Sequence, residues 1–144
     1  MSDPIARVRA SFERQRFMAT LGATLEAVRP GEVVIALPFR PELTQQHGFL
    51  HAGAVTAVVD SACGFAALSL MEPGAGVLSV EFKQNNLAPA AGTLFRAYGR
   101  VLKAGRTLTV CTGELRALRG EEEVLVAVMQ ATMMTVRDRP GVAD

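Results

Sequence analysis

A strongly apolar stretch lies in the middle of the chain, from Ala52 to Leu70. Apolar side chains occupy nearly every face of this stretch at helical spacing, which predicts a helix enclosed by other elements. Asp60 stands at its centre. Because burying an unpaired carboxylate is costly, Asp60 is either a structural group bonded to Thr56 or Ser61, or a catalytic carboxylate in a cleft.

Upstream of this helix, local signals predict one amphipathic helix and a strand hairpin. Asp3 followed by Pro4 is a typical helix start, and apolar residues then recur on one face. Pro30-Gly31 marks a turn. The expected elements are a helix over residues 4–16, strands Thr24–Arg29 and Glu32–Pro38, and a loop over 41–50.

Downstream of the central helix, every segment has the pattern of a strand. Leu78, Val80 and Phe82 alternate with polar residues, which predicts a strand with one wet face. Turns at 72–74, 103–106 and 119–121 separate the segments. The remaining strands are expected at 93–103, 106–118 and 123–136.

This order of elements predicts a single α+β domain over residues 1–144, with a long antiparallel sheet around one buried central helix. Short connections favour antiparallel neighbours. Residues 1–20 supply an N-terminal helix and its lead-in, and the tail 137–144 is expected to fray. A small sheet of this kind leaves open edges and an uncovered face, which invite self-association.

Composition and charge exclude several classes of protein. The net charge is +1 with no basic stripe, which argues against a nucleic-acid partner. The N-terminus is charged where a signal peptide needs an apolar run, and Asp60 argues against a membrane span. Cys63 and Cys111 fall in expected core elements, so we predict a cytoplasmic protein without a disulfide. Buried cysteine is usually inert, which disfavours Cys63 as a nucleophile.

The start of the central helix carries a recognisable motif. His51-Ala52-Gly53 opens the helix, Gln45 lies six residues before His51, and Asp60 lies seven residues after Gly53. This arrangement resembles hotdog-fold acyl-CoA thioesterases of the phenylacetate-pathway (PaaI) type. Their motif is an Asn or Gln, then His-Gly-Gly, then an acidic residue inside the helix. Segments 78–90 and 99–110 also look like this family, so the resemblance covers roughly residues 24–136.

The resemblance implies a hotdog fold and an acyl-CoA substrate hydrolysed without metal or cofactor. It also implies a homodimer or homotetramer whose subunits join their sheets, with sites at the seam. The chain departs from the motif in two places. Ala52 replaces the first glycine, which keeps the backbone N–H but adds a methyl group. Gln45 replaces the usual asparagine, and Gln46 beside it is a rival for the same role.

The motif residues suit thioester hydrolysis. The free N–H groups of a helix start, here Ala52 and Gly53, can stabilise a carbonyl oxyanion, and Gln45 could add a side-chain donor. Asp60 would act as general base or as nucleophile. Ser79 falls where the family has a hydroxyl that holds the water, although an outward strand serine is an equal alternative.

Besides Gln46, four polar residues remain as candidates for binding rather than chemistry. His51 is a helix cap or a supporting donor; with His47 it could grip a metal, but the loop context and the missing third ligand argue against this. Lys103 and Arg106 flank a turn and could meet the coenzyme A phosphates or form a solvated hairpin tip. Asn85, in the polar stretch 83–86, could flank the pantetheine arm or end a wet strand.

Two classes of function follow from these residues. The first is an acyl-CoA thioesterase acting on an aryl- or medium-chain acyl group. The second is a non-catalytic hotdog module that binds acyl-CoA, and a dehydratase of the same fold is a weaker third option. A pure binding module has no use for an ionisable group inside an apolar helix. The presence of Asp60 therefore favours the thioesterase over the non-catalytic binding module.

Overall fold

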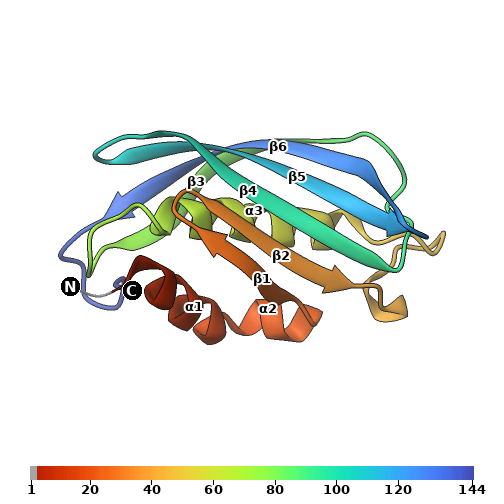
Figure 1. Cartoon of the computed structure of the whole chain (residues 1–144), viewed down its shortest axis with the longest axis horizontal. Helices are drawn as coiled ribbons and strands as arrows, with labels where there is room; N and C mark the ends of the chain where they lie inside the picture. The colour runs from red at the N-terminus through yellow and green to blue at the C-terminus, as the bar shows by residue number, and fades with distance from the viewer. Residues whose placement is uncertain (1–2) are drawn as a thin grey trace.

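A computed structural model describes residues 3–144 and places six antiparallel strands of this part of the chain in one sheet. The sheet has the order β1-β2-β4-β5-β6-β3 and curves around helix α3 (Figure 1). Helices α1 and α2 lie outside, beside β1. The elements are α1 (Pro4–Arg14), α2 (Arg16–Leu21), β1 (Thr24–Arg29), β2 (Glu32–Pro38), a 3-10 turn (Pro41–Leu43), α3 (Ala52–Leu68), β3 (Gly76–Asn86), β4 (Leu94–Ala104), β5 (Leu108–Arg119) and β6 (Glu122–Val136).

The predicted hotdog architecture is confirmed, and the main differences are local. The helix expected over residues 4–16 is two helices, because Gln15 adopts an extended conformation between α1 and α2. Asp3 caps α1 as expected, its Oδ1 accepting the Ile5 N–H at 3.0 Å. The central helix ends at Leu68, two residues before its predicted end. No helix among residues 3–144 is long and apolar enough to cross a membrane.

Strand β3 departs from its predicted pattern. Leu78, Val80 and Phe82 are 41%, 52% and 44% exposed, so the expectation of one wet face and one buried face was wrong for this strand. The reason is its position: β3 is an edge strand, and its pairing with β6 shifts register between Ser79 and Glu81. An apolar, unpaired edge of this length is the kind of surface on which another strand pairs.

Helix α3 lies close against the sheet because two strand glycines face it. A Cβ atom on Gly99 of β4 would lie 2.3 Å from the Ala62 carbonyl oxygen. A Cβ atom on Gly113 of β5 would lie 2.5 Å from a Val59 methyl carbon. Since packed interiors cannot absorb such overlaps without moving, these glycines fix the depth of the helix that carries Asp60.

Replacing Gly99 with alanine is therefore expected to destabilise the fold by about 3 kcal/mol, at the upper end of ordinary overpacking because the clashing atoms are backbone. Urea denaturation measures the loss. Gly64→Ala is the matched control, since a Cβ there meets only the Met133 Sδ, at 3.9 Å. Equal stability of the two variants would contradict the close approach of α3 to β4.

The segment after β6 returns to the N-terminal helix. Asp144 Oδ1 accepts hydrogen bonds from Ser11 Oγ at 2.5 Å and from Arg14 Nη2 at 2.6 Å. Val142 packs against Gly76 at the start of β3. The tail contains no helix or strand, but these contacts place it against α1 and β3, at one end of the central helix.

Candidate active site

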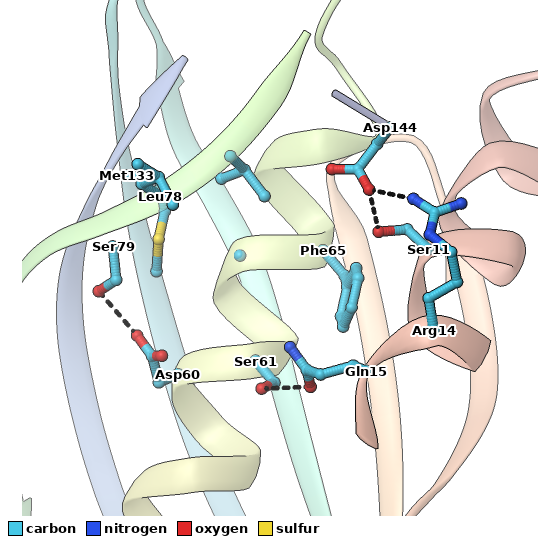
Figure 2. Close-up of a pocket in the computed structure, with 12 residues that line it drawn as sticks. Ser11, Arg14, Gln15, Asp60, Ser61, Phe65, Leu78, Ser79, Met133 and Asp144 are labelled. Carbon is cyan, nitrogen blue, oxygen red and sulfur yellow. Dashed lines mark hydrogen bonds and ion pairs between the residues drawn. The ribbon is translucent and has the colours of Figure 1, made fainter. Parts of the chain in front are cut away.

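Asp60 points from α3 toward β3 rather than toward its own helix. Ser79 Oγ donates a hydrogen bond of 2.9 Å to Asp60 Oδ1 (Figure 2). The hydroxyl of Thr56 donates instead to the Ala52 carbonyl, and that of Ser61 to Gln15 Oε1. The structural interpretation that paired Asp60 with Thr56 or Ser61 is therefore wrong.

The surroundings of Asp60 set its protonation. Partial burial raises the pKa of this carboxyl, and the hydrogen bond from Ser79 lowers it in part. Burial disfavours the charged form, whereas a donor to the carboxylate favours it. The net effect is a carboxylate that is more basic than an ordinary aspartate and held in one orientation by Ser79.

A cleft of about 290 Å³ opens at the Asp60–Ser79 pair and runs between α1, α3 and β3. Figure 2 shows this pair at one end and Ser11, Arg14 and Asp144 at the other. The cleft is lined by Ser11, Arg14, Gln15, Asp60, Ser61, Gly64, Phe65, Val77, Leu78, Ser79, Met133 and Asp144.

The first turn of α3 offers one free donor where the sequence suggested two. His51 caps the helix, and its Nδ1 accepts the Gly53 N–H at 2.7 Å. The His51 carbonyl accepts from Ala54 and Val55. The Ala52 N–H has no acceptor among residues 3–144. The capping function of His51 is thus confirmed, and the Ala52 amide is the donor left available at the helix start.

Gln45 lies beside this free amide. It lines a second cavity, of about 240 Å³, together with Ala52 and Asn86. Its Oε1 accepts the backbone N–H groups of His47 and Phe49, at 2.6 and 3.3 Å, which leaves its side-chain NH₂ as the donor. This geometry supports Gln45 over its neighbour as the side-chain donor.

Gln46 does not line that cavity. Its Nε2 lies 3.4 Å from His47 Nε2, in the exposed part of the loop. Among residues 3–144, no group of three or more His, Cys, Asp or Glu side chains is placed to hold a metal ion.

Asn86 lines the cavity beside Ala52, and the sequence interpretation did not select it. Asn85 was the candidate in the polar stretch of β3, but its Oδ1 accepts from Lys83 Nζ at 2.8 Å, and it does not line the cavity beside Ala52. Adjacent strand residues face opposite sides, so only one of the two asparagines can point toward the helix start. The alternation of side chains along the strand shows that Asn85 and Asn86 face opposite sides. Only the register of β3 in the sheet shows which of the two faces the helix start.

Lys103 and Arg106 lie far from Ala52 within one chain. They belong to the exposed hairpin between β4 and β5, at the opposite end of the sheet from the start of α3 (Figure 1). The Arg106 carbonyl accepts from Arg137 Nη2, near the end of β6. A single chain therefore does not bring the basic hairpin and the helix start together.

Cys63 and Cys111 are fully buried, and Cys111 Sγ donates to the Cys63 carbonyl at 3.6 Å. Burial raises the pKa of Cys63, and it raises that of Cys111 to about 11. A thiol with a raised pKa and no exposure is a poor nucleophile. Asp60 is therefore the better candidate for the reacting group.

Comparison with known proteins assigns the chain to a family. Residues 47–124, which include the helix start and Asp60, match the model of the thioesterase superfamily. A thioesterase family protein from Silicibacter pomeroyi is 53% identical, with 93% of this chain and 98% of that chain covered and a TM-score of 0.92. The chain belongs to the thioesterase superfamily, and it is a thioester hydrolase.

More distant structures share the fold alone. The E. coli PaaI protein of the phenylacetic acid degradation operon is 18% identical, covers 98% of this chain and 96% of its own, and has a TM-score of 0.83. A Haemophilus influenzae thioesterase is 21% identical, with coverages of 88% and 87% and a TM-score of 0.80. Together with the family match, they confirm the predicted resemblance to hotdog thioesterases.

Proposed function

We propose that the protein hydrolyses the thioester of an aryl- or medium-chain acyl-CoA to the free acid and coenzyme A. The observation that carries this proposal is the partly buried Asp60, hydrogen-bonded to Ser79 at the mouth of a cleft. Asp60 would remove a proton from the attacking water or attack the carbonyl carbon directly. Its raised pKa makes the ionised carboxylate a better base than that of an ordinary aspartate.

The developing oxyanion would be held by the Ala52 N–H and the side-chain amide of Gln45. Both border the same cavity, and the first is unpaired among residues 3–144. The helix dipole adds positive potential at that point. Loss of one preorganised donor of this kind costs about 3–4 kcal/mol of transition-state stabilisation.

The base and the donor come from different chains in this proposal. Asp60 lies about 12 Å along the helix axis from Ala52 at the start of α3, and the free N–H points away from it. The cavity that contains Ala52 shares no lining residue with the cleft that contains Asp60. An attacking atom must lie about 3–3.5 Å from the carbonyl carbon, so one chain leaves the two groups too far apart.

Two chains could form a shared site by pairing through the exposed edge strand β3. A two-fold antiparallel pairing of β3 with itself, centred between Phe82 and Lys83, would set Ser79 opposite Asn86 of the partner subunit. This pairing satisfies the backbone groups at the edge of β3 and sets the partner's side chains beside its exposed apolar residues. It brings the Asp60 side of one chain to the Ala52 side of the other, in a homodimer or a dimer of dimers.

The same pairing suggests a function for the basic hairpin between β4 and β5. The start of β5 pairs with the end of β6, which pairs with the start of β3, so Lys103 and Arg106 lie at the Ser79 end of their sheet. Dimerisation through β3 would carry that end toward the partner's helix start. There the two cations could meet the coenzyme A phosphates by charge attraction.

The pH dependence of kcat/KM tests the role of the Asp60–Ser79 pair. The rate should fall on acidification through one step, as Asp60 becomes protonated. Ser79→Ala removes the hydrogen bond that lowers the pKa of Asp60, so the step should move to higher pH. The measurement is a set of initial rates between pH 4 and the plateau.

Ser61→Ala is the matched control for this profile, since its hydroxyl lines the same cleft but bonds to Gln15 instead of Asp60. Its acid step should stay in place. A profile that is flat on the acid side until the protein unfolds, or an equal displacement in both serine variants, would count against Asp60 as the titrating base.

A further inference from the structure

Gly64 is a glycine in the interior of α3 without a structural reason to be one. Glycine destabilises a helix interior relative to alanine. At Gly99 and Gly113 the close approach of α3 explains the absence of a side chain. A Cβ on Gly64 would meet only Met133 Sδ, at the ordinary contact distance of 3.9 Å, and its φ is not in the left-handed region. Neither packing nor backbone geometry requires glycine here.

The position of Gly64 relates it to the reaction centre. It follows Asp60 by four residues, so the two lie on the same face of α3, about 6 Å apart along the axis. Both line the same cleft. An acyl group attached to a carbonyl carbon beside Asp60 would pass directly over Gly64. The missing side chain leaves room at the point where the acyl group begins.

Apolar side chains line the cleft beyond Gly64 together with the hydrogen-bonded pair Gln15 and Ser61, and the far end of the cleft is charged. Phe65, Leu78 and Met133 lie along it, and the Asp144 carboxylate closes it by accepting from Ser11 and Arg14 (Figure 2). A cavity of roughly 150 Å³ is enough to hold benzene, and the cleft measures about 290 Å³. An extended apolar chain would have to reach hydrogen-bonded charges, whose desolvation is costly.

We propose that the cleft over Gly64 is the acyl subsite and that Gly64 sets the size of acyl group accepted. The subsite takes compact acyl groups that are branched or cyclic next to the thioester, in preference to long straight chains. This inference rests on the proposed function, because it assigns the acyl half of the same substrate. Gly64 acts by leaving space and takes no part in the chemistry.

The test compares Gly64→Ala and Gly64→Leu with wild type on acetyl-CoA and benzoyl-CoA. The ratio of kcat/KM for benzoyl-CoA to that for acetyl-CoA should fall in both variants, and by roughly tenfold or more in Gly64→Leu. Both substitutions introduce good helix formers. Gly64→Ala should melt no lower than wild type, which separates the filling of the cleft from damage to the fold.

A binding measurement separates this inference from the proposed function. In an Asp60→Asn background, calorimetry with benzoyl-CoA and with free coenzyme A should show that Gly64→Leu weakens the first far more than the second. If wild type hydrolyses neither thioester but this difference appears, the hydrolase proposal fails and the acyl subsite stands.

Three results would overturn the role of Gly64. The first is an unchanged benzoyl-to-acetyl ratio in an active enzyme, and the second is equal weakening of benzoyl-CoA and free coenzyme A. The third is a large drop in the melting temperature of Gly64→Ala, which would show that packing requires the glycine.

Discussion

Asp60→Asn is expected to lower kcat by about 10²–10⁴-fold and to leave substrate affinity nearly unchanged. The amide keeps the shape of the side chain and can still bond to Ser79, but it cannot accept a proton or attack the carbonyl. The assay is release of free thiol from an acyl-CoA in the presence of EDTA, with KM or a direct binding constant measured beside it. A variant with near-wild-type kcat would remove Asp60 from the mechanism.

The same variant should be more stable than wild type at neutral pH. Burial raises the pKa of Asp60 above its ordinary value of 3.8, so the folded state disfavours the ionised form. Wild type therefore loses stability as the pH rises from about that value through the folded-state pKa. The stability gain of Asp60→Asn should be full above this window and vanish below it. Thermal melts at neutral and acidic pH provide this readout, and they show that lost activity is not lost folding.

Mixing two inactive variants is expected to restore about a quarter of wild-type activity. The pair is Asp60→Ala and Ala52→Pro. If each site joins Asp60 of one chain to Ala52 of the other, a mixed dimer has one site with both defects and one with neither. Random exchange makes half of the dimers mixed, and each of these has one working site of two. The measurement is thiol release before and after subunit exchange.

The structure makes Ala52→Pro a suitable partner in this experiment. Ala52 is the first residue of α3, where proline is tolerated, and its N–H has no acceptor among residues 3–144. His51 before it has φ −62° and ψ 138°, a conformation that proline permits in the preceding residue. Differently tagged chains purified together establish exchange. Exchange without recovered activity would place both halves of the site in one chain.

Features that depend on neighbouring residues could be predicted from the sequence. Asp3 and Pro4 begin α1 because a side-chain cap and a fixed φ act within one turn. Pro30-Gly31 joins β1 to β2 as expected, with Gly31 at φ 77°. The apolar run predicted a buried central helix, and Asp60 within it stays the proposed reacting group. Together with the helix-opening motif, these local signals defined the fold and the family.

The arrangement of the site required the tertiary structure. Ser79 could be assigned to Asp60, and Asn86 distinguished from Asn85, only once the register of β3 was known. The cap that occupies the Gly53 N–H depends on the side-chain orientation of His51, which residue spacing does not specify.

Strand order likewise decided which surfaces are exposed. A period of two shows that Leu78, Val80 and Phe82 share a face, but not whether that face is covered. The order β1-β2-β4-β5-β6-β3 leaves β3 at the edge, where the face stays open. Local patterns encode conformation, whereas these features arise from contacts between residues far apart in sequence, and those contacts exist only once the sheet has closed around α3.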